Sequence, residues 1–303
     1  MLPTPSTSHV PYSRVYEPAE DSFLLLDTFS QDSETSFLSD RFPTSSPTPL
    51  LLEVGPGSGV VLAFLTAHAA TLFGRSDVLT LGVDVNWFAC EAAKETVRRA
   101  VKEAEEEEEA AAEGEVGKRD GENNGEAEGE GRTQNTRNRK SGRLLATAQG
   151  DLASPLRPGA VDVLVFNPPY VPTDELPTLP KELADPAAAT PAVATTNDDS
   201  GKRKPVPKTT YAQDSTLLAL AYAGGRDGME VTDRLLAAVP DILSQRGVAY
   251  VLLCAQNRPE EVKARVRAWE SDGGRWMAET VGSSGNKAGW ERLQIVRIWR
   301  AVA

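Results

Sequence analysis

The sequence predicts an α/β protein with a seven-stranded, mostly parallel sheet, helices on both faces of the sheet and an antiparallel hairpin at the C-terminus. Short, continuous apolar runs alternate with segments of helical length, which is typical of strands that are covered on both faces. Glycine-rich or polar turns follow the early runs, and no helix separates the last two. Together these three observations indicate a doubly wound sheet that ends in a hairpin.

The predicted elements follow one another along the chain. Strands are expected at 49–55, 80–85, 143–152, 161–167, 247–255, 274–282 and 291–301. Helices are expected at 60–73, 86–101, 230–243 and 259–270. Asn86 is expected to cap the second helix, because an asparagine side chain can accept a hydrogen bond from a first-turn amide. The last two strands are joined by a Gly/Ser/Asn-rich segment, so they are expected to pair as a hairpin.

Two segments do not fit this alternation. Residues 103–141 are rich in charge and glycine, and residues 180–208 mix Pro, Ala, Lys and Asp without periodicity. We expect both to be disordered insertions, since neither can bury enough apolar surface to offset its ordering entropy. Residues 1–14 are expected to be a flexible N-terminus, and residues 15–303 a single domain.

Charge and cysteine content narrow the function. The net charge is −12, but residues 101–131 alone hold thirteen acidic and three basic side chains, so the rest of the chain is close to neutral. This disfavours a broad nucleic-acid-binding surface, and we expect no direct nucleic-acid partner. The acidic run is either a solvated spacer or a partner-binding segment. The two cysteines, Cys90 and Cys254, have no CxxC pattern, and no apolar run is long enough for a membrane span. A cytoplasmic location, with or without a nuclear pool, is expected, and no bound metal.

The first candidate site residues lie in the glycine-rich turn "LEVGPGSG" after the first strand. Gly55, Gly57 and Gly59 allow the backbone to approach a ligand closely and to direct helix amides toward it. Glu53 precedes the turn, and a carboxylate there would repel a pyrophosphate. The turn is therefore expected to bind a cationic or hydroxyl-rich ligand, although a plain tight turn would have the same glycines.

Two acidic residues follow the next strands. Asp84, which ends the second strand, can accept both ribose hydroxyls of an adenosine ligand, or it can cap the following helix. Asp151 and Leu152 follow the third strand, where an acid and a backbone amide can hold an adenine amine and ring nitrogen. In isolation Asp151 would be an ordinary turn residue. The series of strand ends favours an adenosyl ligand.

The fourth strand ends in Asn167-Pro168-Pro169-Tyr170, followed by Val171. A conjugated NH2 group is a poor nucleophile, so a site that activates it should accept hydrogen bonds from both N–H groups. The Asn167 side-chain carbonyl and the Pro168 backbone carbonyl can be these acceptors, and the prolines stiffen the loop. Tyr170 can lie against the flat substrate group. A proline-terminated edge strand is the simpler alternative.

With these residues in place, the chain resembles a class I S-adenosylmethionine-dependent methyltransferase of the amino-methylating type. The segments "VYEPAEDSFLLLD", "LEVGPGSGVV", "VDVLVFNPPYV" and "AGGRDGMEVTDRLL" are similar to the eukaryotic branch of the HemK-type protein-glutamine methyltransferases. The resemblance spans the chain except its first dozen residues and the two insertions. It implies the Rossmann-like class I methyltransferase fold and S-adenosylmethionine as cofactor. It also implies methylation of the GGQ glutamine in the eukaryotic class I release factor.

The resemblance also implies site residues and partners. Cofactor contacts are expected at Ser22, Glu53, Gly55, Asp84, Asp151, Leu152 and Asn167. The target glutamine is expected at Asn167 to Val171. The resemblance implies that the chain is a catalytic subunit, which needs a small zinc-binding activator subunit as its partner. The release factor would be methylated with or without its GTPase partner. Arg226 and Asp227 either position the substrate peptide or cap the next helix.

Three other functions share parts of this pattern. A nucleic-acid adenine methyltransferase uses the same NPPY loop but usually adds a target-recognition region and a basic face. A protein lysine methyltransferase would have to hold an ammonium group in a loop suited to a planar amide. A non-catalytic scaffold subunit could retain the cofactor pocket, but the loop of this chain is intact.

Overall fold

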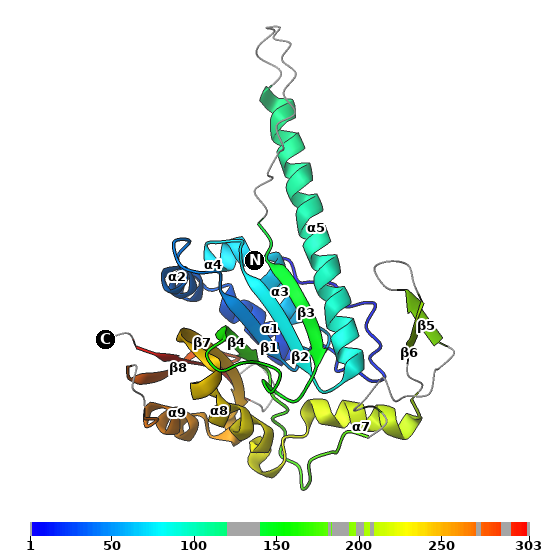
Figure 1. Ribbon diagram of the computed structural model, residues 1–303, viewed down its shortest axis with the longest axis vertical. Helices are drawn as coiled ribbons and strands as arrows, with labels where there is room; N and C mark the ends of the chain where they lie inside the picture. The colour runs from blue at the N-terminus through cyan, green and yellow to red at the C-terminus, as the bar shows by residue number, and fades with distance from the viewer. Residues whose placement is uncertain are drawn as a thin grey trace.

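The computed structural model describes residues 2–119, 140–180, 183, 194–197, 203–206, 209–270, 274–285 and 292–301. Its centre is a seven-stranded sheet with the order β3-β2-β1-β4-β7-β9-β8 (Figure 1). The strands are β1 Leu50–Val54, β2 Leu79–Asp84, β3 Arg143–Gln149, β4 Val161–Phe166, β7 Leu243–Cys254, β8 Trp276–Ser283 and β9 Leu293–Arg300. The first five are parallel neighbours, whereas β9 pairs antiparallel with both β7 and β8. The predicted fold class and C-terminal hairpin are confirmed.

The helices occupy the predicted segments and several others. They are α1 Glu20–Phe29, α2 Asp32–Arg41, α3 Val60–Ala67, α4 Ala69–Phe73, α5 Trp87–Arg119, α7 Tyr211–Tyr222, α8 Glu230–Ile242 and α9 Pro259–Arg267. The single helix predicted at 60–73 is divided at His68, whose backbone departs from helical geometry. The sequence did not predict α2, because it lacks an apolar stripe and buries only Glu34 and Leu38.

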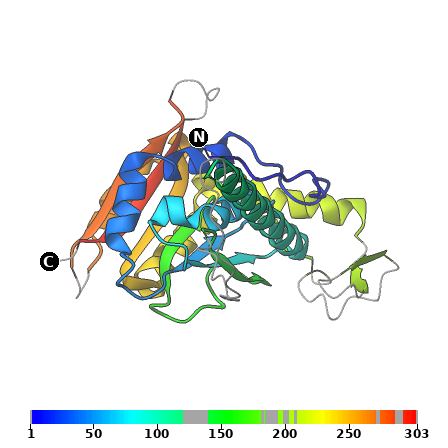
Figure 2. The same ribbon diagram turned by 90° about the horizontal axis from the view of Figure 1, so that it is seen from above.

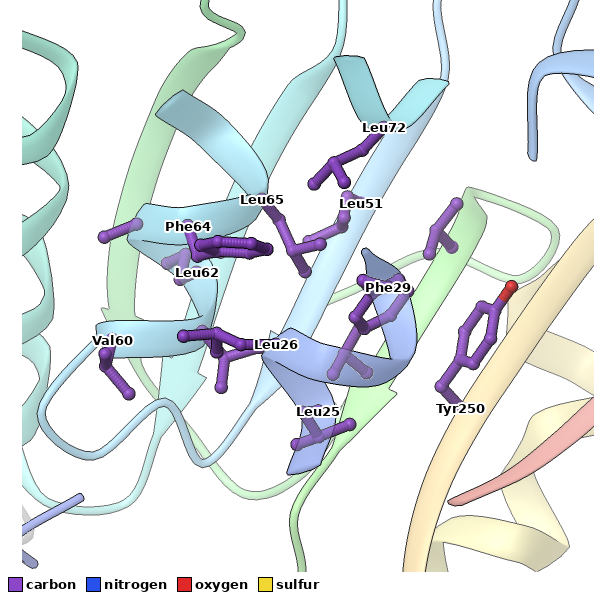
Figure 3. Close-up of a cluster of buried hydrophobic side chains, with 14 of the residues drawn as sticks. Leu25, Leu26, Phe29, Leu51, Val60, Leu62, Phe64, Leu65, Leu72 and Tyr250 are labelled. Atoms are coloured by element: carbon purple, nitrogen blue, oxygen red, sulfur yellow. The ribbon is translucent and has the colours of Figure 1, made fainter. Parts of the chain in front are cut away.

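Helices cover both faces of the sheet because its strands alternate buried side chains between the faces. Leu51 packs with α1 to α5 on one face, and its neighbour Leu52 packs with α8 and α9 on the other. Figure 3 shows the first of these clusters, in which Phe29 of α1 lies against Tyr250 of β7 with ring centroids 4.6 Å apart. The two hydrophobic clusters, one on each face of the sheet, hold the strands in place. The loops at the carboxyl ends of the strands therefore extend from a rigid frame.

The N-terminal segment differs from the expected flexible tail. Val10 is buried in a cluster with Phe88, and the Arg14 guanidinium lies 4.6 Å from the centroid of the Phe88 ring. The Arg14 carbonyl also accepts a hydrogen bond from the Asn86 side chain at 2.8 Å. These contacts hold residues 10–14 against the start of α5, near the carboxyl end of β2.

The two predicted insertions are described in part. Residues 103–119 continue α5, which extends away from the sheet as a long helix (Figures 1 and 2), and residues 120–139 lie outside the described residues. Within 180–208, β5 Ala194–Asn197 pairs with β6 Arg203–Val206, and most other residues lie outside the description. Among the helices that are described, none combines the length and apolarity needed to cross a membrane. Among all the described residues, no group of three His, Cys, Asp or Glu side chains is placed to hold a metal ion.

Candidate active site

A cavity of about 210 Å³ opens where β1, β2 and β4 end, with walls from α7 and from the segment before α1. Parallel α/β sheets bind ligands at the carboxyl ends of their strands. The predicted site residues that line it are Ser22, Gly55, Gly57, Asp84, Asp151, Leu152, Asn167, Pro168 and Pro169. Four predicted residues do not line it, namely Glu53, Gly59, Tyr170 and Val171. Residues predicted from separate strand ends thus surround one space.

The three glycines of the turn after β1 all have left-handed backbone, with φ of 65° at Gly55, 53° at Gly57 and 79° at Gly59. Side-chain-bearing residues are strained in this region. A Cβ atom at Gly55 or Gly57 would meet nothing within 4 Å, whereas one at Gly59 would lie 2.4 Å from the Cα of Ala93 in α5. Gly55 and Gly57 therefore shape the cavity, and Gly59 allows α3 and α5 to pack closely.

Asp84 presents its carboxylate to the cavity at the end of β2. Its Oδ2 accepts a hydrogen bond from the Gly57 N–H at 3.3 Å, and its Oδ1 accepts one from the Asn86 N–H at 2.8 Å. The Asn86 Oδ1 accepts from the Phe88 N–H at 3.0 Å, which confirms Asn86 as the cap of α5. Asp84 therefore does not cap that helix itself. Burial raises the pKa of Asp84 to about 6, so the carboxylate is ionised at neutral pH and can accept hydroxyl groups.

Asp151 has a partner that the sequence did not reveal. Its carboxylate accepts a charge-assisted hydrogen bond from the guanidinium of Arg234 in α8, and Arg234 also lines the cavity. Both side chains are about half exposed, at 54% and 53%. A contact between Asp151 and an adenine amine would share the carboxylate with Arg234. Leu152, which follows, has a left-handed backbone with φ of 53°.

Glu53 differs from its predicted role as a cofactor contact. Its side chain is only 2% exposed and does not line the cavity. The carboxyl group accepts a hydrogen bond from the Leu62 N–H, a first-turn amide of α3, and its Oε2 has no partner among the described residues. Burial raises the pKa of Glu53 to about 8, so the group is largely neutral at pH 7. It supports the start of α3 and presents little negative charge to a ligand.

Replacing Glu53 by glutamine is expected to reduce the pH dependence of stability. The folded pKa of about 8 exceeds the unfolded value of 4.5, so the folded chain retains a proton that the unfolded chain releases. The free energy of unfolding should therefore fall as the pH rises between these values, by roughly 2–5 kcal/mol. Glutamine has no such proton. Denaturant unfolding of wild type and Glu53→Gln at both ends of this range measures the difference.

Glu95→Gln is the matched control for this experiment. Hydrogen bonds from Arg98, with a further contribution from Arg99, lower the pKa of Glu95 to about 2. The stability that Glu95 contributes is therefore lost as the pH falls toward that value, whereas the stability that Glu53 contributes is lost as the pH rises. The same pH dependence in Glu53→Gln and wild type would contradict the burial of a protonated Glu53.

Asn167 follows β4 and offers an acceptor that the described chain leaves unused. Its side-chain Oδ1 is buried and has no hydrogen-bond partner among the described residues, although the residue lines the cavity. Leaving a buried polar atom unpaired costs about 1–3 kcal/mol. A ligand that donates an N–H group to this oxygen would recover that cost. The arrangement fits the predicted binding of a planar NH2 group.

Tyr170 and Val171 are not among the residues that line the cavity. The partly buried Tyr170 side chain packs against the hydrophobic cluster formed with α1 to α5. Its backbone carbonyl accepts a hydrogen bond from the Asn257 side chain at 3.2 Å. Val171 bridges to Ala223, and its N–H donates to the Tyr222 carbonyl at 3.0 Å. Neither residue lines the cavity, and their backbone hydrogen bonds anchor the loop.

Sequence reasoning missed the side walls of the cavity. Tyr16 and Asp21 come from the segment around the start of α1, and Leu217 and Leu220 come from α7. A signal for α7 was present, because its N-terminus is a capping box formed by Thr210 and Gln213. In the N-terminal wall only Ser22 was predicted, from the family resemblance of its segment, and the contacts that hold this segment against α5 could not be predicted from the sequence.

The residues present fit an adenosyl cofactor with a sulfonium group. Asp84 is placed to accept ribose hydroxyls, the glycine turn admits close approach, and apolar side chains such as Val83 and Leu152 can cover an adenine ring. A seven-stranded sheet with its last strand inserted antiparallel before an edge strand, carrying this cavity, defines a class I methyltransferase. S-adenosylmethionine is its methyl donor.

Comparison with known proteins gives the family. The chain is 32% identical over 304 residues to the eRF1 methyltransferase catalytic subunit mtq2 of Schizosaccharomyces pombe, covering 99% of this chain and 96% of that protein. It is 30% identical over 267 residues to methyltransferase HEMK2 of Mus musculus, covering 86% and 83%. The Homo sapiens HEMK2 is 31% identical over 265 residues, covering 86% and 82%. The chain belongs to this family of eukaryotic HemK-type glutamine methyltransferases. No protein-family model matches it.

Likeness to solved structures is weaker. A human methyltransferase 10 domain containing protein matches 91% of this chain and 81% of its own, with 12% identity and a TM-score of 0.39. This likeness adds nothing to the family assignment.

Proposed function

We propose that the chain methylates the side-chain amide of the glutamine in the GGQ motif of the eukaryotic class I release factor. The observation that carries the proposal is the buried, unpartnered Oδ1 of Asn167 on the wall of the cavity that also holds Asp84. The Schizosaccharomyces pombe relative is an eRF1 methyltransferase catalytic subunit, which supports this substrate.

The chemistry follows from the acceptors around the amide. The bound cofactor supplies an electrophilic methyl group on a sulfonium. An amide nitrogen is a poor nucleophile because its lone pair is delocalised into the carbonyl group. Asn167 Oδ1 and the Pro168 carbonyl accept the two amide hydrogens, which fixes the nitrogen and favours a geometry in which its lone pair can attack. The nitrogen would gain the methyl group as the bond from that carbon to sulfur breaks, and the sulfur would leave as a neutral thioether. The nitrogen would release its surplus proton afterwards, so no strong general base is required.

We further propose that the chain acts as the catalytic subunit of a heterodimer with a small zinc-binding activator. Strand β3 is one of the two edge strands of the sheet, and Leu145 on it is 52% exposed, so a partner strand could extend the sheet there. The aromatic residue Phe88, which follows the carboxyl end of β2, does not offer a second apolar surface to a partner, because it is 6% exposed and lies beneath Arg14. A soluble, monomeric and fully active chain purified alone would refute this assembly.

The substrate is tested by co-expressing the chain with the activator and measuring methyl transfer to the release factor, with and without its GTPase partner. Transfer should occur to the intact release factor and disappear when the GGQ glutamine is replaced by alanine. Equal transfer to the alanine variant would exclude the proposed acceptor. Histone-type lysine peptides and adenine-containing DNA, assayed in parallel, test the lysine and nucleic-acid alternatives.

A further inference from the structure

A buried asparagine joins the loop after β4 to two neighbouring segments. Asn257 is 2% exposed and follows β7 in the short helix η2 Ala255–Asn257. Its Nδ2 lies within hydrogen-bond distance of three backbone carbonyl oxygens, those of Tyr170 at 3.2 Å, Asp227 at 3.0 Å and Gly228 at 3.3 Å. Its Oδ1 accepts from the Cys254 N–H at 2.8 Å. The side chain therefore fixes the loop relative to the end of a central strand.

The turn formed by residues 223–228 packs against the same loop at two points. A Cβ atom on Gly224 would lie 2.4 Å from the Pro169 carbonyl oxygen, and one on Gly228 would lie 2.0 Å from the Tyr170 carbonyl oxygen. Arg226 and Asp227 are exposed, and the Arg226 N–H donates to Glu230 Oε1 at 3.1 Å. The two backbones approach so closely that a displacement of the turn would displace the loop.

A shift at Tyr170 would be transmitted to Asn167. The two residues between them, Pro168 and Pro169, have φ fixed by their rings, so they have little freedom to absorb it. Asn257 is not among the residues that line the cavity. Its effect on catalysis would therefore act through the loop backbone.

We infer that Asn257 is a positioning residue for methyl transfer, which holds the acceptors of the loop after β4 at their working distance from the cavity. The inference rests on the proposed role of Asn167 and Pro168 as acceptors for the glutamine amide. It gives the 223–228 turn a function as the second support of the loop, and it assigns neither Arg226 nor Asp227 a contact with the substrate.

The test is Asn257→Asp, a near-isosteric change that keeps the acceptor for the Cys254 N–H and replaces the donor with an oxygen facing three carbonyls. In the heterodimer, at saturating cofactor and well below the melting temperature, kcat should fall about 100-fold. The cofactor dissociation constant should remain at its wild-type value, because Asp84 and the glycine turn are unchanged. A folded variant with wild-type kcat would overturn the inference, as would losses of kcat and cofactor affinity in equal proportion.

A second variant decides the matter if Asn257→Asp does not fold. A Cβ atom from Gly224→Ala would meet the Pro169 carbonyl oxygen and also the Gly228 carbonyl group, so it displaces the loop from the side of the turn and leaves the Asn257 side chain itself unsubstituted. Gly224 has no left-handed φ to add strain. The Gly224→Ala variant should show the same loss of kcat with cofactor affinity kept, and wild-type kcat would overturn the inference.

Two reference variants separate a loss of loop positioning from general damage to the core and from failure of the proposed acceptor role of Asn167. Thr232→Val changes a fully buried polar side chain of α8 whose Oγ1 has no partner in the described chain, and it should leave kcat unchanged. Asn167→Ala reports on the acceptor itself. If Asn167→Ala remains active, the proposed function fails. If Asn167→Ala is inactive and the folded Asn257 and Gly224 variants are fully active, only the positioning role fails.

Discussion

Replacing Asn167 by alanine is expected to lower the turnover number for methyl transfer about 10²–10³-fold, the loss typical of removing one preorganised hydrogen-bonding group from an active site. The physical reason is that the amide nitrogen loses one of its two acceptors. The Asn167 Oδ1 has no hydrogen-bond partner in the described chain, so the change removes an acceptor that no other described residue uses. Single-turnover assays with saturating cofactor and release factor measure the effect.

Cofactor affinity serves as the control for Asn167→Ala. Asp84, Gly55 and Gly57 remain in place, so calorimetric titration should give a dissociation constant close to that of wild type. Turnover near the wild-type rate in a folded variant would remove Asn167 from the mechanism. Parallel losses of turnover and cofactor affinity would show instead that the cofactor pocket itself had been damaged.

Asp84→Ala should weaken cofactor binding about 100-fold. The carboxylate can accept two hydroxyl groups, and each hydrogen bond to a charged group contributes about 1.5–3 kcal/mol, part of which is offset by desolvation. The existing bonds from the Gly57 and Asn86 amides orient the carboxylate before the ligand arrives. Calorimetry measures the dissociation constant, and an unchanged value would exclude Asp84 as a ribose ligand.

The pH dependence of binding gives a second test of Asp84. The pKa of about 6 means that the free protein takes up a proton as the pH falls through that value. Because the ionised carboxylate is the form that accepts both hydroxyls, affinity should fall about tenfold per pH unit below it. Asp84→Asn, which keeps the shape and cannot titrate, should bind weakly with little pH dependence.

The strand ends that carry the candidate site could be predicted from the sequence. The direction in which each side chain points could not always be predicted. Asp84 ends β2 and Asn167 directly follows β4, where the chain must turn toward the cavity. Glu53 lies one residue before β1 ends. Alternation along β1 puts Glu53 on the same face as Leu51, beneath α3, and so away from the cavity. Attention to that alternation would have corrected the prediction.

Other differences depended on contacts between distant segments. Tyr170 was expected to lie against the substrate because it adjoins the Asn-Pro-Pro segment, but its side chain does not line the cavity and packs against the hydrophobic cluster formed with α1 to α5. Asp151 pairs with Arg234, which lies on a helix far along the chain. The sequence around either residue does not predict these partners. The role of Asn257 could not be predicted for the same reason, because its hydrogen-bond partners include residues far away in the sequence.

The most direct test of the central claim is to locate the transferred methyl group by tandem mass spectrometry of the release factor after reaction with the heterodimer. The claim that two acceptors hold a planar amide predicts a single methyl group on the side-chain nitrogen of the GGQ glutamine. It also predicts that the methyl group is absent with Asn167→Ala. A methyl group found on a lysine, or on the glutamine at an equal rate with Asn167→Ala, would contradict it.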